Sequence, residues 1–367
     1  MRFHVLGLFH TRTSKRYPTC AFTQKVLKLC VMLKGLGHEV IHYGNEGSEA
    51  LCDEQVNIFT NEEYDSIFGK SDTYYWIDGW ETNTKDRAIF DSRCIAAVNT
   101  RKKMGDVLII AWGWNQKTIS DAVNIPLTVE SGIGYLGVFA PYRVFESYGW
   151  MSFINGVQSV KENAGKWWGD WRPQDAVIPN YFDPSDFTFQ KDKGDYILFV
   201  GRMNVDKGVQ DCIDLAARTK TRLILAGPQS GWKYRMNGYS EIIPPVGFEE
   251  RNRLMGGARA VLTLSAYHEP FGGTTVEAGF CGTPVITTDW AAFSDTVKHG
   301  VTGYRCRDLN EMEWSLRNID TIKPDDCRKW AEEKFSLSVI APQYDAYFKR
   351  IYDGAGSLSS CPVRAFR

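Results

Sequence analysis

The sequence predicts two doubly wound α/β domains that face each other across a cleft. Short apolar runs of buried-strand length alternate with segments whose apolar residues recur at helical spacing. The chain has 367 residues, which is enough for two domains of ordinary size, each with its own core. Its contents of 43% hydrophobic and 24% charged residues are ordinary for a globular protein. These observations favour parallel sheets covered by helices.

The composition argues against several classes of protein. A formal net charge of −1 gives no overall electrostatic reason to expect nucleic acid or an anionic membrane as partner. The nine cysteines are scattered singly and none groups with the six histidines, so we expect neither a metal site nor a disulfide framework. The N-terminal apolar run is too short for a signal peptide, and no later run reaches membrane-spanning length. We therefore expect a cytoplasmic protein with reduced thiols and no integral membrane segment.

The chain opens with a predicted βαβ unit. Phe3–Phe9 predicts a buried strand, Thr23–Leu36 a helix, and Glu39–Tyr43 a second strand. The loop between the first strand and the helix then lies at the carboxyl edge of the sheet, where open α/β sheets bind ligands. This loop contains three basic residues, Arg12, Lys15 and Arg16. It is either a solvated loop or a patch for an anionic ligand.

The rest of the first half is less informative. Residues 44–104 give no indication of a substrate, although a helix is predicted over Arg87–Lys103. Four aromatic residues cluster in this stretch: Tyr74, Tyr75, Trp76 and Trp80. Buried strands are predicted at Asp106–Ala111 and Pro126–Glu130, and a helix over Arg143–Gln158 that packs in the core or lines the acceptor side.

Glu130 is a candidate site residue because it ends the second of these strands. The following residues, Ser131–Gly134, form a tight and approachable loop. A glutamate at a strand end is either simply exposed or in contact with a substrate, and both interpretations stay open.

The second half repeats the strand–helix alternation. Lys191–Asp195 is polar, which is typical of a linker. Strands and helices follow in alternation after it. We expect strands at Tyr196–Val200, Arg222–Ala226, Ala260–Leu264 and Val285–Thr287, and helices at Val209–Arg218, Thr275–Cys281, Asn310–Arg317, Asp325–Lys334 and Leu337–Tyr352.

A glycine turn in this half is the best candidate site. Gly272 and Gly273 separate the strand Ala260–Leu264 from the following helix, so the turn lies at a helix N-terminus. Unpaired N–H groups and the helix dipole favour an anion there, and glycine lets a phosphate approach the backbone. Glu269 and Glu277 bracket the turn and could accept hydrogen bonds from sugar or ribose hydroxyls.

The order of residues around this turn resembles a known family. E-P-F-G-x-x-x-x-E followed by C-G-T-P-V-I is similar to the E-x7-E signature of retaining GT-B glycosyltransferases of the glycogen-synthase-like family four, also called glycosyl transferases group 1. Gly201–Gly208 resembles the family's G-R-x-x-x-x-K-G, and Val177–Asn180 its V-I-P-N. The resemblance is strongest from Val177 to Tyr304, weaker before Gly44, and without motif in between.

The resemblance implies roles for individual residues. Arg202 and Lys207 would hold the donor diphosphate over the turn Gly272, Gly273, Thr274 and Thr275, because a guanidinium and an ammonium neutralise charge on a departing nucleoside diphosphate. Glu277 would bind the ribose and Glu269 a sugar hydroxyl. Three residues are candidates for the base: Val246, Gly247 and Phe248. Cys20 and Ala21 stand where the family commonly has a Gly-Gly pair near the donor phosphates, and Glu130 stands where relatives often place a histidine.

The family also implies a domain organisation, namely the GT-B fold of two Rossmann-like domains. We expect an acceptor domain over residues 1–185 and a nucleotide-sugar donor domain over 195–335. The helix over 337–353 would cross back onto the first domain, and 354–367 would be a flexible tail.

We therefore expect a retaining glycosyltransferase that moves a sugar from a nucleotide-diphosphate sugar to a hydroxyl of a glycan, lipid or small molecule. The donor would be a UDP-sugar, with GDP- and ADP-sugars as alternatives, and no cofactor would be tightly bound. No D-x-D triplet is present, which fits a fold that usually manages without a metal ion. Three alternatives stay open: the same chemistry on a modified DNA base, a non-catalytic sugar-nucleotide binding protein, and a sugar-nucleotide epimerase.

Overall fold

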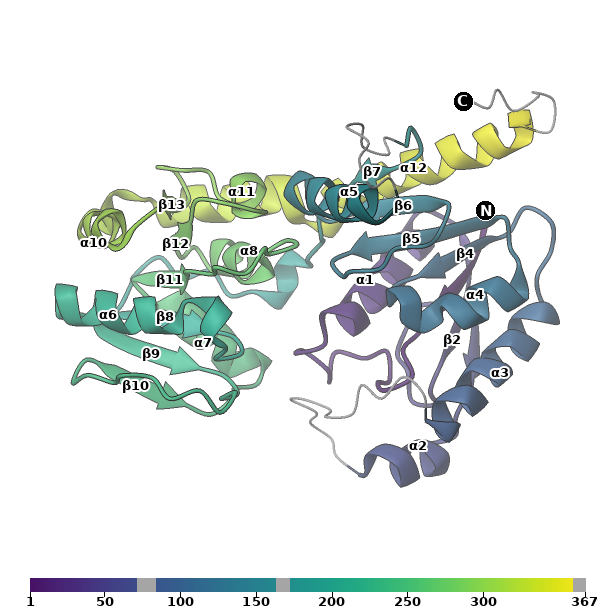
Figure 1. The fold of residues 1–367 in the computed structure, drawn as a ribbon, viewed down its shortest axis with the longest axis horizontal. Coiled ribbons are helices and arrows are strands. Elements are labelled where there is room, and N and C mark those ends of the chain that lie inside the picture. Colours follow the sequence, from purple (N-terminus) through teal and green to yellow (C-terminus); the bar gives the residue numbers. More distant parts are fainter. Residues whose placement is uncertain (71–83, 163–171, 359–367) are drawn as a thin grey trace. The chain divides into compact units, whose positions relative to one another are not determined.

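The computed structural model describes residues 1–70, 84–162 and 172–358. The described residues form two compact units, each built on one parallel sheet with helices (Figure 1). The N-terminal unit comprises the described residues of Met1–Glu146, Glu162–Tyr181 and Ile340–Arg367. The C-terminal unit comprises Ser147–Lys161 and Phe182–Val339. The predicted α/β class with two parallel sheets is confirmed.

The sheet of the N-terminal unit has seven strands in the order β3-β2-β1-β4-β5-β6-β7, all parallel. The strands are β1 (Arg2–Leu6), β2 (Glu39–Gly44), β3 (Glu54–Asn57), β4 (Val107–Ile110), β5 (Leu127–Ile133), β6 (Tyr142–Phe145) and β7 (Ala176–Val177). The helices are α1 (Ala21–Gly35), α2 (Asn61–Phe68), α3 (Lys85–Asn99) and α4 (Lys117–Val123). The strand order reverses between β1 and β4, so their carboxyl ends form the topological switch point.

Most predicted elements of this unit form where expected, with one exception. Strand β4 is fully buried along its length because a parallel sheet is covered on both faces, which explains its unbroken apolar run. The predicted helix over Arg143–Gln158 is wrong at its start. Tyr142–Phe145 forms β6, and α5 (Tyr148–Glu162) begins after it. Val144 and Phe145 are completely buried, so a short buried strand was hidden in an apolar, aromatic segment. The predicted aromatic cluster at Tyr74–Trp80 lies outside the described residues.

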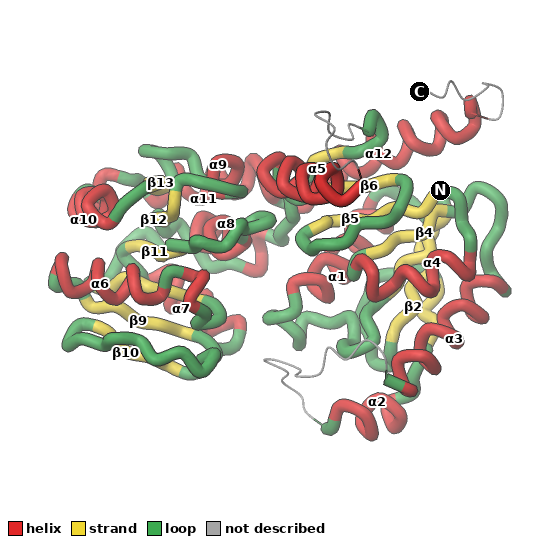
Figure 2. Tube along the Cα trace, in the orientation of Figure 1, coloured by secondary structure: helices red, strands yellow, loops and turns green. Residues whose placement is uncertain are grey.

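The sheet of the C-terminal unit has six parallel strands in the order β10-β9-β8-β11-β12-β13 (Figure 2). The strands are β8 (Tyr196–Val200), β9 (Arg222–Ala226), β10 (Ser240–Ile243), β11 (Ala260–Thr263), β12 (Val285–Thr288) and β13 (Gly303–Cys306). The helices are α5, α6 (Val209–Thr219), α7 (Phe248–Gly257), α8 (Gly273–Phe280), α9 (Phe293–Thr296), α10 (Leu309–Arg317) and α11 (Pro324–Phe335). The switch point lies between β8 and β11.

Alternate residues of each central strand point to opposite faces of this sheet. Ile197 and Phe199 of β8 pack in one core cluster with α6 and α10, whereas Leu198 packs in the other with α7, α8 and α11. Both faces are therefore buried under helices, and only the ends of the strands are left for a ligand.

The last helix, α12 (Leu337–Leu358), extends beyond its predicted end at Tyr352. The first residues of the predicted tail, from Gly354 to Leu358, are thus helical. From Ile340 on, α12 belongs to the N-terminal unit, where Tyr344 and Phe348 are completely buried. Phe348 packs edge-on against Phe3 of β1 with ring centroids 4.8 Å apart. Across residues 1–70, 84–162 and 172–358, no helix combines the length and apolarity that crossing a membrane requires.

Candidate functional site

The candidate site lies at the carboxyl ends of β8 and β11, on either side of the switch point of the C-terminal sheet. The loop Gly201–Gly208 follows β8, and the loop from Leu264 to Gly272 follows β11. Open α/β sheets bind ligands at this edge because loops and helix N-termini converge there. Both loops carry residues that the sequence singled out.

Backbone contacts hold these two loops together. The carbonyl oxygen of Asp206 accepts hydrogen bonds from the backbone N–H groups of Ala266 (2.9 Å) and Tyr267 (3.0 Å). Gly208 has a φ of +67°, and a Cβ at this position would lie 2.0 Å from the carbonyl oxygen of Leu264. Glycine is therefore required for this approach. The consequence is that Lys207 lies against the loop after β11.

Lys207 forms an ion pair with Glu269. The Lys207 Nζ donates to Oε1 of Glu269, and Ser265 Oγ donates to the same oxygen at 2.9 Å. The ammonium also lies 4.7 Å from the ring centroid of Tyr267. The side chains of Lys207 and Glu269 are 19% and 11% exposed, so their attraction is less screened than that of a surface pair. The structure thus brings together two residues that the sequence predicted separately.

Arg202 lies on the same loop as Lys207. Its side chain is exposed, and its carbonyl oxygen accepts a hydrogen bond of 3.0 Å from the backbone N–H of Asn204. The preceding strand and the glycine at 201 place it at the carboxyl end of β8.

The glycine turn begins α8 as predicted. Gly272 caps the helix in the left-handed conformation, with a φ of 74°, and a Cβ there would lie 2.7 Å from Cε1 of Phe293. No side chain caps this end, and the first turn contains no acidic residue. Gly273 and Thr274 are partly exposed in the first turn, where backbone N–H groups have no partner within the helix. The turn therefore offers donors and a favourable dipole to an anion.

The Thr275 side chain is buried within the turn that begins α8. Its backbone N–H and its hydroxyl both donate to the carbonyl oxygen of Gly272, at 2.9 and 2.8 Å. Its side chain is only 4% exposed and lies 3.2 Å from the Thr296 hydroxyl, measured between the two oxygens. Thr275 therefore stabilises the turn from inside.

Glu277 is paired with an arginine that the sequence reasoning missed. Arg251 of α7 donates from Nη2 to Oε2 of Glu277 on α8. The two side chains are 21% and 19% exposed. No motif singles out Arg251, because it lies on a different helix and meets Glu277 only in the folded unit.

The three candidates for contact with the base lie together after β10. Gly247 caps α7, and Phe248 is its first residue. Phe248 is 39% exposed, with its ring 5.9 Å from that of Phe187, and Val246 packs partly against the core. These residues therefore begin the helix that carries Arg251.

The loop after β11 is also supported by an aromatic cluster around His268. The imidazole stacks on Phe153 of α5 with ring centroids 4.6 Å apart and meets Trp290 edge-on at 5.0 Å. His268 Nε2 lies 3.3 Å from the carbonyl oxygen of Gly149. Trp290 donates from Nε1 to the carbonyl oxygen of Ser265 at 3.1 Å. These contacts fix the backbone that leads into Glu269.

In the N-terminal unit, Cys20 and Ala21 begin α1 near the switch point of that sheet. Cys20 is the N-cap residue and Ala21, the first residue of the helix, is exposed. The Thr23 hydroxyl donates to Cys20 Sγ at 3.1 Å. Burial raises the pKa of the Cys20 thiol, so it is neutral at pH 7.

Glu130 lies inside a strand rather than at its end. Strand β5 continues past it to Ile133, so Glu130 lies within the sheet and is completely buried. Its Oε2 accepts hydrogen bonds from the backbone N–H groups of Phe139 (2.8 Å) and Ala140 (2.9 Å). Burial raises the pKa of Glu130 although these hydrogen bonds oppose the shift. The carboxylate therefore holds the loop before β6 in place.

The three basic residues of the loop after β1 differ in their surroundings. Arg12 donates to Oδ1 of Asp65 at 3.0 Å and to Oδ1 of Asn61 at 2.9 Å. Its guanidinium lies 4.2 Å from the ring centroid of Tyr64. Arg12 is thus engaged within its own unit, whereas Lys15 and Arg16 are exposed.

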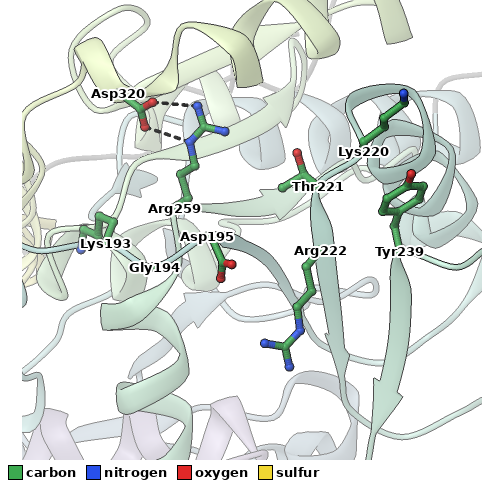
Figure 3. A pocket seen from close by; sticks show the side chains of 9 residues that line it. All are labelled: Lys193, Gly194, Asp195, Lys220, Thr221, Arg222, Tyr239, Arg259 and Asp320. Carbon is green, nitrogen blue, oxygen red and sulfur yellow. Dashed lines mark hydrogen bonds and ion pairs between the residues drawn. The ribbon is translucent and has the colours of Figure 1, made fainter.

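A hollow on the opposite edge of the C-terminal sheet is a different feature (Figure 3). Its lining includes Asp195, Arg222 and Arg259, which lie at the amino ends of β8, β9 and β11. Arg259 makes two hydrogen bonds with Asp320, at 2.9 and 2.7 Å, and Arg222 pairs with Glu241. Ligands of open α/β sheets bind at the carboxyl ends, so this hollow is not the candidate site.

The described residues contain no group of three or more histidine, cysteine, aspartate or glutamate side chains that could hold a metal ion.

Part of this chain, including the candidate site of the C-terminal unit, matches a known protein family. Residues 185–334 match the sequence model of the family "Glycosyl transferases group 1". A glycogen synthase of Mycobacterium tuberculosis is 27% identical over 187 residues, which cover 46% of this chain and 45% of that protein. A D-inositol 3-phosphate glycosyltransferase of Nocardia farcinica is 28% identical over 138 residues, covering 32% and 31%. The matched region thus covers less than half the length of each of these curated relatives.

Solved structures match nearly the whole chain. AviGT4, a glycosyltransferase involved in avilamycin A biosynthesis, has a TM-score of 0.66 at 20% identity, covering 96% of this chain and 98% of its own. Sucrose-phosphate synthase from Thermosynechococcus elongatus has a TM-score of 0.69 at 14% identity, covering 96% and 99%. HepE of Anabaena, solved with UDP-glucose, has a TM-score of 0.63 at 14% identity, covering 95% and 100%. These matches show that the fold is that of the GT-B glycosyltransferases.

Proposed function

We propose that this chain, with a GT-B fold and a segment matching glycosyl transferases group 1, is a retaining glycosyltransferase. It would transfer a sugar from a nucleoside-diphosphate sugar to a hydroxyl acceptor. The observation that carries the proposal is the Lys207–Glu269 ion pair at the carboxyl edge of the C-terminal sheet, in the unit that contains the N-terminus of α8. A cation, a carboxylate and a helix N-terminus are the groups that bind a diphosphate linked to a sugar.

In this proposal the donor diphosphate lies over Gly272–Thr274. Lys207 and Arg202 neutralise its charge, and the first-turn N–H groups of α8 donate to phosphate oxygens. Glu269 accepts a hydrogen bond from a sugar hydroxyl, and Glu277 from the ribose. When the donor binds, Lys207 is shared between Glu269 and the phosphate, so the lysine links the leaving group to the sugar.

The bond that breaks joins the anomeric carbon to an oxygen of the β-phosphate, and its electron pair leaves with the nucleoside diphosphate. The acceptor oxygen bonds to the anomeric carbon from the same face, and its proton passes to a donor phosphate oxygen. The step therefore needs no dedicated protein base. Lys207 and Arg202 lower the barrier because negative charge grows on the phosphate as the bond breaks.

We propose a UDP-sugar as donor, with GDP- and ADP-sugars as the alternatives. The support is that HepE, which shares the fold, was solved with UDP-glucose, with UDP, and with UDP and glucose. The acceptor is proposed to be a hydroxyl of a glycan, lipid or small molecule. A DNA acceptor loses support because Arg12, one of the three basic residues that suggested it, is engaged with Asp65. The N-terminal unit is proposed as the acceptor domain and the C-terminal unit as the donor domain.

Thermal stabilisation by a panel of UDP-, GDP- and ADP-sugars tests this proposal, since a ligand that binds only the folded state raises the unfolding temperature. We expect one nucleotide class to stabilise the wild type and to lose this effect in Lys207→Ala. Lys329→Ala is the matched control, because Lys329 is also a paired lysine of the C-terminal unit but is 70% exposed on α11. Absence of stabilisation by every donor, or equal stabilisation of the Lys207→Ala variant, would contradict the proposed donor site.

A further inference from the structure

We infer that Arg251 is a positioning residue that orients Glu277 toward the ribose of the donor and thereby makes the protein select ribonucleotides. This inference rests on the proposed function, because it needs a nucleotide donor at the carboxyl edge of the C-terminal sheet. The structural basis is the charge-assisted hydrogen bond from Arg251 Nη2 to Glu277 Oε2.

The pair joins two helices that begin beside different parts of the proposed donor. Arg251 lies in the first turns of α7, where its backbone N–H donates to the carbonyl oxygen of Gly247 at 2.9 Å. Helix α7 starts directly after Val246 and Gly247, the candidates for contact with the base. Glu277 lies on α8, whose first turn is the candidate for contact with the diphosphate. The ribose connects base and diphosphate in every nucleotide, so the pair lies between the two helices where a ribose would be recognised.

The hydrogen bond engages one of the two carboxylate oxygens of Glu277. Oε2 accepts from Arg251, which among the described residues leaves Oε1 as the oxygen to accept from a ligand. Both side chains are about one-fifth exposed, with 21% for Arg251 and 19% for Glu277. A side chain that is mostly enclosed and paired holds one rotamer, so Oε1 keeps a defined direction.

Arg251 has little else to bind. Its Nε is buried and has no hydrogen-bond partner among the described residues. The guanidinium is therefore committed to Glu277 rather than being a general surface charge. Arg251 also neutralises the carboxylate of Glu277, which would otherwise repel the diphosphate at the N-terminus of α8. Both effects act on donor binding, and neither acts on the bond between the anomeric carbon and the phosphate oxygen.

A hydrogen bond to a hydroxyl discriminates strongly against a ligand that lacks it, because the protein group is then left unpaired. The test uses calorimetric dissociation constants for whichever of UDP, GDP and ADP binds the wild type, and for its 2′-deoxy and 3′-deoxy forms. We expect the wild type to bind the ribonucleotide about tenfold or more tightly than at least one deoxy form.

Arg251→Met separates a positioning role from a packing role. We expect Arg251→Met to weaken binding of the ribonucleotide about tenfold and to affect much less the binding of the deoxy form that the wild type discriminates against. The ratio of the two dissociation constants should therefore fall toward one. Arg251→Lys keeps the charge but loses the planar fork, and it should retain part of the selectivity. Arg253→Met is the matched control on the same helix, because Arg253 forms an exposed pair with Glu250, and it should behave as the wild type.

Three outcomes would overturn the inference. If Arg251→Met weakens the ribo and deoxy forms by the same factor, Arg251 only supports the fold of the site. If it leaves both dissociation constants as they are in the wild type, Glu277 is oriented without Arg251. If no nucleoside diphosphate binds the wild type, the proposed function fails as well, so that failure is distinguishable from the first two. If Arg251→Met does not fold, Arg251→Lys decides, since unchanged selectivity in that variant would contradict a geometric role.

Discussion

Lys207 and Glu269, which are 62 positions apart in sequence, meet as an ion pair at the carboxyl edge of the C-terminal sheet. Each member of the pair neutralises the other, so neither charge is left alone in a partly buried position. A donor that enters this site adds a phosphate on the lysine side and a sugar hydroxyl on the carboxylate side. The pair therefore keeps both groups in place before the donor arrives, which lowers the cost of ordering them.

Replacement of Lys207 by alanine tests the role of the cation. We expect turnover to fall about hundredfold or more, because the variant lacks the charge that stabilises the departing diphosphate. Steady-state rates of nucleoside diphosphate release measure this, with Lys329→Ala as the control. Near-normal turnover by a folded Lys207→Ala protein would contradict the assignment.

Replacement of Glu277 by alanine should act mainly on donor binding. The proposed ribose contact exists in both the ground state and the transition state, so KM for the donor should rise about tenfold while kcat changes little. Initial rates over a range of donor concentrations give both parameters. A fall in kcat with unchanged KM would argue against a ribose contact.

Gly208→Ala should destabilise the C-terminal unit. A Cβ at this position would lie 2.0 Å from the carbonyl oxygen of Leu264, and φ is +67°. We expect a loss on the order of 2–4 kcal/mol from the clash and the backbone strain together. Chemical denaturation of the variant measures the free energy of unfolding.

Gly231→Ala is the control for this prediction. Gly231 also has a positive φ, +79°, but nothing lies within 4 Å of a Cβ built there. It isolates the backbone strain, for which we expect about 1 kcal/mol. Equal effects of the two substitutions would show that the contact between the two loops is not the cause.

Glu130→Gln tests the reassignment of this residue by its pH dependence. Burial raises the pKa of Glu130 in the folded state, so the folded protein binds the proton more tightly than the unfolded chain. The stability that this group contributes is fully present below the unfolded pKa of about 4.5 and is lost as pH rises through the folded pKa. Glutamine does not titrate.

The unfolding temperature of Glu130→Gln relative to wild type should therefore increase from pH 4 to pH 7. Turnover at pH 7 should stay within about threefold of the wild type. A constant difference in unfolding temperature would contradict the shift in pKa. A hundredfold loss of turnover in a folded variant would return Glu130 to the catalytic groups.

The sequence predicted the central strands of both sheets, because strands buried on both faces are nearly continuous apolar runs, but it did not predict β3, β7, β10 or β13 nearer the sheet edges. It missed β6 because the short strand Tyr142–Phe145 runs directly into the apolar helix α5. It also placed Glu130 at a strand end, although β5 continues to Ile133 through an irregularity in its pairing with β6. Where a strand stops depends on the neighbouring strand, which a single sequence does not contain.

Short sequence motifs also predicted the candidate site, but they did not predict which of its side chains form ion pairs or hydrogen bonds with each other. The glycine turn, Lys207 and Glu269 are recognisable from short motifs. The contact between Arg251 and Glu277 depends on how α7 and α8 pack and on the rotamers that this packing selects. The inward position of the Thr275 hydroxyl depends on the helix geometry after the turn.

The most direct test of the central claim is hydrogen–deuterium exchange of the wild type with and without the stabilising nucleotide sugar, because bound phosphate protects the amides it contacts. We predict protection of the loop Gly201–Gly208 and of the first turn of α8. The amino ends of β8 and β9 around Asp195 and Arg222 should be unchanged. Protection of that opposite edge, with none at α8, would contradict a donor site at the Lys207–Glu269 pair.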